Sequence, residues 1–152
     1  MKKEFLTYEQ ATQLKELGFD EPTSFYWENN TIKPLPMKDE VGGFHFNRYT
    51  NNVDWISAPL KQQVFRWFRE KYGYCVSIRK RYFQNVAEVE YNYFIYPPNS
   101  NEHLEHNLLD EYESWEEAES ACIDDLIKLV KGNGTIDFIC PDPNCPHCNY
   151  NE

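Results

Sequence analysis

Three cysteines and a histidine near the C-terminus are the residues whose types and spacing most directly suggest chemistry. In the run CPDPNCPHC, Cys145 and Cys148 form a Cys-x-x-Cys pair, and Cys140 adds a third thiol. Two thiolates in one tight turn are a common half of a tetrahedral zinc site. Because a structural zinc ion needs four ligands, the fourth must come from His147, from Asp142, from a distant histidine or from a second chain.

The same tail admits two other interpretations. The one we favour is a flexible, thiol-bearing C-terminus without metal, because the motif itself does not supply a complete ligand set. The string CPHC also matches the active-site spacing of disulfide oxidases, in which a following helix stabilises the thiolate. Only four residues follow Cys148, so we do not expect that helix or that activity.

A second candidate metal site lies in the acidic segment that precedes the last predicted helix. His103 and His106 are three residues apart and are accompanied by Glu102 and Glu105. One helical turn would bring such side chains together. An exposed, solvated polar segment explains the same residues without a metal, and we favour it.

A third group of candidates is basic. Arg79, Lys80 and Arg81 precede Tyr82 and Phe83 on one predicted strand, and this mixture is typical of surfaces that bind single-stranded nucleic acid. The candidate nucleic-acid-binding residues are Arg66, Arg69, Arg79, Lys80 and Arg81. The alternative, which we favour, is that the aromatic side chains fill the core while the charges protect an edge strand.

The charge distribution constrains the partner. A formal net charge of −10 disfavours a general nucleic-acid binder, because such proteins neutralise phosphates with Lys and Arg. Residues 102–125 contain ten acids and no Lys or Arg. This run could imitate a phosphate backbone, although a solvated acidic helix face explains it more simply.

Several classes of protein are not expected. The sequence has no GxSxG motif, no phosphate-cradling glycine loop and no His-Cys pair with an orienting group, so we predict that it is not an enzyme. It has no apolar stretch long enough for a signal peptide or a membrane span, which predicts a cytoplasmic protein. Five cysteines, an odd number, disfavour a disulfide framework.

The elements that must position these residues are well marked. Thr7 and Gln10 form a capping box for a helix that ends at Gly18, and residues 24–33 predict a hairpin that turns at Asn29-Asn30. Ser57 is the predicted cap of a helix that ends near Gly73. Strands are expected over 74–83, over 88–96 and, briefly, at 44–46, and a helix capped by Ser114 over 114–131.

This order predicts an α+β fold in which about three helices pack on a small antiparallel sheet. We expect a single domain over residues 1–131. Residues 132–152 form a short C-terminal tail rich in Gly, Pro and Cys.

Three stretches of the sequence each resemble a stretch found in a known group of proteins. They are FLTYEQATQLKEL at 5–17, SAP at 57–59 followed by FRWFREKY at 65–72, and residues 112–131. The whole resembles short proteins found on prophages and other mobile elements of gut Bacteroidetes. The resemblance spans roughly residues 5–131 and rests on helix faces and caps. It implies a phage or mobile-element origin and brings no established activity.

We therefore expect a non-enzymatic interaction module that binds a host or phage protein through aromatic and acidic surfaces. The alternative is a small nucleic-acid-binding protein with a zinc-stabilised tail. That alternative requires Arg79, Lys80 and Arg81 to share one exposed face.

Overall fold

The computed structural model describes residues 2–34, 55–82, 89–99 and 111–132. Within these residues the helices are η1 (Lys2–Glu4), α1 (Tyr8–Glu16), α3 (Lys61–Tyr72) and α4 (Trp115–Val130). The strands are β1 (Phe25–Glu28), β2 (Thr31–Pro34), β3 (Ile56–Ser57), β4 (Cys75–Tyr82) and β5 (Val89–Tyr96). The predicted α+β class is confirmed. No helix among these residues is long and apolar enough to cross a membrane.

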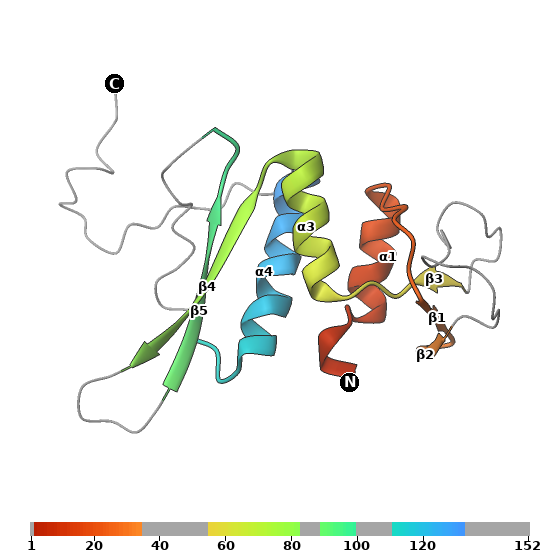
Figure 1. Ribbon diagram of the computed structural model, residues 1–152, viewed down its shortest axis with the longest axis horizontal. Coiled ribbons are helices and arrows are strands. Elements are labelled where there is room, and N and C mark those ends of the chain that lie inside the picture. The colour runs from red at the N-terminus through yellow and green to blue at the C-terminus, as the bar shows by residue number, and fades with distance from the viewer. Residues whose placement is uncertain (1, 35–54, 83–88, 100–110, 133–152) are drawn as a thin grey trace.

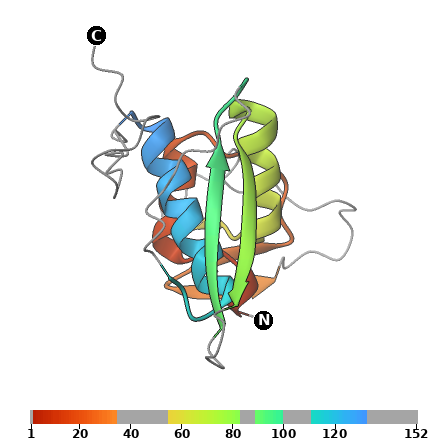
Figure 2. The same ribbon diagram turned by 90° about the vertical axis from the view of Figure 1, so that its left-hand side faces the viewer.

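The strands divide into two antiparallel sheets, with the order β2-β1-β3 in one and β4-β5 in the other. The helices lie between them, so that α4 and α3 back the β4-β5 hairpin and α1 lies next to the three-stranded sheet (Figure 1). Figure 2 looks onto the hairpin, with α4 behind β5 and α3 behind β4. The fold therefore has two small sheets where the sequence suggested one.

Local sequence signals explain α1 and the first hairpin. Thr7 and Gln10 form the predicted reciprocal capping box. Asn29 and Asn30 both adopt positive φ, at 50° and 59°, which is the conformation of a two-residue hairpin turn. This turn sets the register in which β1 and β2 pair.

The predicted cap of the second helix is wrong. Ser57 lies in β3, opposite Tyr26 of β1, and is buried. The chain stays extended through Ala58, whose N–H donates to the Phe25 carbonyl at 3.0 Å. The helix begins only after Leu60, whose side chain makes no cap hydrogen bond. Pairing with β1 satisfies the backbone hydrogen-bonding groups that a helix starting at Ser57 would otherwise have used.

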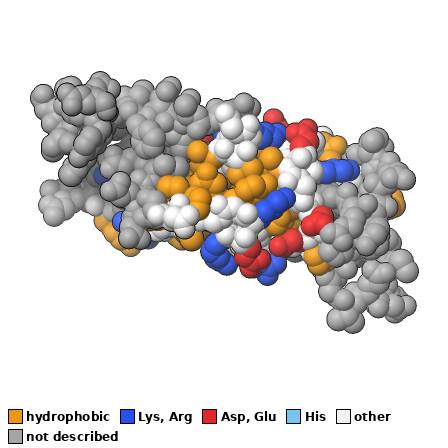
Figure 3. Space-filling view, turned by 90° about the horizontal axis from the view of Figure 1, so that it is seen from above, with side chains coloured by type: hydrophobic (Ala, Val, Ile, Leu, Met, Phe, Trp, Pro, Cys, Tyr) orange, Lys and Arg blue, Asp and Glu red, His pale blue; other side chains and the backbone are white. Residues whose placement is uncertain are grey.

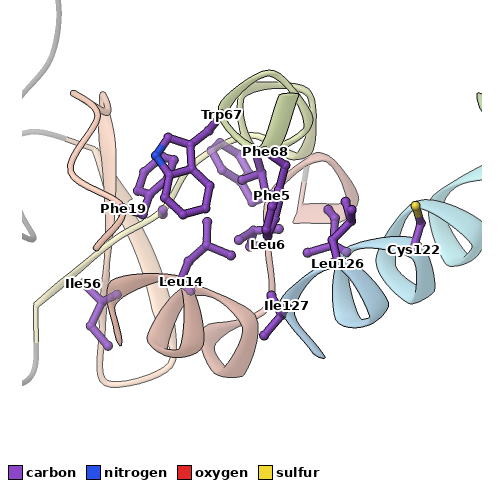
Figure 4. Packing of buried hydrophobic residues seen from close by; sticks show 14 of the residues in the cluster. Phe5, Leu6, Leu14, Phe19, Ile56, Trp67, Phe68, Cys122, Leu126 and Ile127 are labelled. Carbon is purple, nitrogen blue, oxygen red and sulfur yellow. The ribbon is translucent and has the colours of Figure 1, made fainter. Parts of the chain in front are cut away.

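One hydrophobic core joins all three α-helices. Figure 4 shows side chains from α1, α3 and α4 converging with residues from the loops that precede and follow α1. Fully buried members include Leu6, Leu14, Phe19, Phe68 and Leu126. On the face of the molecule seen in Figure 3, hydrophobic side chains gather in the centre with charged side chains around them.

A buried polar pair fixes the hairpin to α4. Tyr93 of β5 donates its hydroxyl hydrogen bond to Asp125, which also receives Lys128 Nζ at 2.9 Å. The Tyr93 ring stacks on Tyr112 with centroids 5.8 Å apart. Burial, followed by the hydrogen bond to Asp125, raises the pKa of Tyr93 far above its ordinary value.

We expect Tyr93→Phe to lower the free energy of unfolding by about 1–3 kcal/mol at neutral pH, because a buried acceptor loses its donor. The wild-type protein should lose stability as the pH rises above 10.0, since the folded state keeps a phenolic proton that the unfolded state releases. The variant should lack that contribution. Urea unfolding at neutral and alkaline pH tests this, with Tyr82→Phe at a 74% exposed position as control. Equal stability losses in the two variants would contradict it.

Candidate functional site

The predicted basic cluster is divided between two faces of the hairpin. Successive side chains of a strand point to opposite faces, so Arg79 and Arg81 lie on one face of β4 and Lys80 on the other. Arg79 Cζ lies 4.7 Å from the Phe94 ring centroid, and Lys80 Nζ lies 5.0 Å from the Tyr82 ring centroid. The structure therefore does not bring these three cations into one row.

The two arginines of α3 differ in their surroundings. Arg66 pairs with Glu21 at 2.9 Å, and this hydrogen bond raises the pKa of its guanidinium. Arg69 is exposed, and its side chain forms no ion pair or hydrogen bond with another described residue. Only the second of the two is available to a ligand without breaking an existing contact.

The predicted metal ligands lie outside the described residues. They are Cys140, Cys145, His147, Cys148, His103 and His106, and the alternative ligand Asp142 lies there too. In the ranges that the structure describes, no three His, Cys, Asp or Glu side chains are placed to hold a metal ion. The described cysteines are Cys75, which is exposed, and Cys122, which is buried and whose thiol pKa is raised by burial.

A groove with a volume of about 370 Å³ lies between α3 and β4, and we call it the β4 groove. One wall is a stripe of α3 formed by Gln62, Phe65 and Arg69, at positions i, i+3 and i+7. The other wall is five consecutive residues, Tyr74 to Ile78. Trp115, the first residue of α4, also lines it and is 42% exposed.

The lining shows that this groove follows the edge of the strand. Consecutive strand residues point to alternate faces, so a hollow lined by all of Tyr74 to Ile78 lies along the strand's side. Among the described residues β4 pairs only with β5, which leaves its other edge without a neighbouring strand (Figure 2). Such an edge presents backbone N–H and C=O groups that can pair with another chain.

A buried ion pair holds the wall of the groove in place. Lys61, at the start of α3, donates to the Glu116 carbonyl at 2.7 Å and lies 3.8 Å from a Glu119 carboxylate oxygen. Gln62, which lines the groove, donates to the other Glu119 oxygen at 2.7 Å. Burial lowers the pKa of Lys61, and the Glu119 charge partly opposes that change. These contacts fix α3 against the first turns of α4, where Trp115 lies.

A second hollow, of about 470 Å³, lies on the other side of Lys61. Its lining mixes Lys3 and Lys61 with Glu116 and Glu117. Because both signs of charge line it, it favours no single class of ligand, and the β4 groove is the better candidate.

Comparison with known protein families, with curated proteins and with solved structures finds no match to this chain. The candidate site therefore rests on geometry alone. Sequence reasoning identified Arg69 as a candidate, together with Arg66, Arg79, Lys80 and Arg81. It missed the groove, because an open strand edge beside a helix is a tertiary feature. An acid on the apolar stripe of the last helix, Glu119, was the signal that could have revealed the buried pair.

Proposed function

We propose that this chain is a non-enzymatic protein-interaction module of phage or mobile-element origin, which binds an extended segment of a host or phage protein in the β4 groove. The observation that carries the proposal is the open edge of β4 facing one stripe of α3. An extended segment that adds to such an edge gains main-chain hydrogen bonds, and the flanking side chains select its sequence. The resemblance to mobile-element proteins supports the origin.

The dimensions of the groove suit a short peptide. Tyr74 to Ile78 would pair with about five residues of a partner, or about 17 Å of extended chain. Phe65, Tyr74 and Trp115 offer aromatic surface to the side chains of that segment. Aromatic residues are enriched at the centres of protein interfaces.

Selection from a displayed peptide library tests this function directly. We expect selected peptides to slow hydrogen exchange at the amides of residues 74–78 and to slow alkylation of Cys75, which lines the groove. Peptide-resolved mass spectrometry separates this thiol from the others. Buried Cys122 serves as the unreactive control.

Two outcomes would contradict the proposal. Selected peptides that protect other residues but leave 74–78 and the Cys75 thiol unchanged would place binding elsewhere. Tight binding of single-stranded oligonucleotides that weakens steeply with salt would instead favour the nucleic-acid alternative.

A further inference from the structure

Building on the proposed function, we infer that the segment bound in the β4 groove is acidic: it pairs a Glu or Asp side chain with Arg69 and packs an apolar side chain against Trp115. The two anchors lie at opposite ends of the groove. The bound segment is thus recognised by two of its side chains, one acidic and one apolar, and not by its main chain alone.

The first argument concerns the partners of the cations on α3. Lys61 is held by Glu116 and Glu119, Arg66 by Glu21, and Lys71 donates to the Leu17 carbonyl at 3.1 Å. Arg69 is the one α3 cation whose side chain contacts no acceptor among the described residues. In a chain with 25 acids and 15 Lys and Arg, an arginine whose side chain forms no ion pair with a described residue is informative. A carboxylate from a ligand would form the charge-assisted pair that the chain itself does not supply.

The second argument concerns the charge around the groove. Among the described residues that line the groove, Arg69 is the only charged one. Further along the same strand, Arg79 lies over the Phe94 ring and Lys80 over the Tyr82 ring. Arg81, by contrast, lies 4.0 Å from a Glu111 carboxylate oxygen, so the positive charge beyond the groove comes from Arg79 and Lys80. This local positive charge attracts an acidic segment although the chain as a whole is negative.

The third argument fixes the spacing of the anchors. α3 ends where β4 begins, and α4 begins at the opposite end of the helical layer (Figure 1). Arg69 therefore lies near the start of β4, and Trp115 lies beyond Gln62. Gln62 and Arg69 are seven residues apart, or about 10.5 Å along the helix. Side chains at i and i+4 of an extended peptide share a face and span about 13–14 Å, which exceeds the Gln62–Arg69 length and so reaches past Gln62 toward Trp115.

A second copy of this chain fits the groove poorly. Pairing two β4 edges would join two chains that each carry a net charge of −10.

The probes are two fluorescein-labelled nonapeptides of Thr and Ser, each with Leu at the third position. One has Glu at the seventh position and the other has Gln there. By fluorescence anisotropy, we expect the Glu peptide to bind about tenfold more tightly than the Gln peptide, since a charge-assisted bond contributes about 1.5–3 kcal/mol. Arg69→Gln should abolish that difference by weakening only the Glu peptide. Arg66→Gln, which removes an exposed arginine of the same helix outside the groove, should leave it intact.

Charge reversal provides the stricter test. Arg69→Glu should reject the Glu peptide and bind a third peptide with Lys at the seventh position. Equal binding of the Glu and Gln peptides to the wild type would overturn the inference that the partner is acidic. If either peptide then still slowed hydrogen exchange at residues 74–78, the proposal that a segment adds to the β4 edge would stand. Absence of saturable binding by both would count against both proposals. A concentration-dependent dimer that protects residues 74–78 would show that a second copy is the occupant.

Discussion

Replacing Glu119 by leucine should lower the free energy of unfolding by about 3–5 kcal/mol, because it leaves the buried amine of Lys61 without its counter-charge. The Lys61 side chain is 5% exposed and the Glu119 side chain 8% exposed, so water cannot readily replace the lost partner. Gln62 also loses its acceptor. The double variant Lys61→Met, Glu119→Leu should recover much of the loss, since it removes both charges.

The pH dependence gives this prediction a second readout. Burial lowers the pKa of folded Lys61 below its ordinary value of 10.5, so the unfolded chain binds more protons between the two values. Stability should therefore rise as the pH rises through that window. In Glu119→Leu the interaction that raises the Lys61 pKa is lost. The increase in the free energy of unfolding should therefore begin at lower pH and be larger than in the wild type. Urea unfolding between pH 7 and about 10 measures it. A double variant as unstable as the single one would refute the explanation.

Gly73→Ala should destabilise the protein by about 2–5 kcal/mol, from a left-handed backbone and a steric clash together. Gly73 ends α3 with φ of 80°, and a Cβ there would lie 2.8 Å from Pro98 Cβ. The pyrrolidine ring cannot rotate away as a flexible side chain would. Because this residue leads directly into β4, the substitution should also disturb the β4 groove.

Gly132→Ala is the matched control for that prediction. Gly132 has φ of 72°, and a Cβ there would meet no atom of the described residues within 4 Å. The free energy of unfolding of this variant should fall only by the cost of the left-handed backbone conformation, about 1–2 kcal/mol. Thermal or denaturant unfolding of both variants separates the two contributions. Equal losses would show that the contact with Pro98 does not resist the added methyl group.

The elements predicted from the sequence are those whose signals are local. Thr7 and Gln10 stabilise the first turn of their own helix, and Asn29-Asn30 form a turn whose conformation needs no distant partner. Ser114 likewise accepts from the Glu117 N–H as predicted. The cap predicted at Ser57 was wrong because Ser57 pairs instead with Tyr26, on a strand 31 residues earlier in the chain. Division of the strands between two sheets depends on long-range packing in the same way.

The candidate site was predicted only in part. The alternation of side chains along a strand already separates Lys80 from Arg79 and Arg81, and the structure follows that rule. The availability of Arg69 depends instead on where Glu21 lies, because Glu21 pairs with Arg66 and not with Arg69. No pattern in the sequence predicts the distance between Glu21 and Arg66. The cysteine and histidine candidates stay predictions, since they lie outside the described residues.

The packing of α1 against α4 has a consequence for synthesis. Gln10 donates to the Ser120 carbonyl at 3.0 Å and to Asp124 at 2.9 Å, and Lys131 pairs with Glu16 at 2.8 Å. These contacts close loops of more than a hundred residues, which form slowly. A nascent chain leaving the ribosome lacks the α4 side chains that cover part of the apolar face of α1 until α4 has emerged. Folding during synthesis can therefore be completed only after α4 has emerged, because α4 supplies part of the single core.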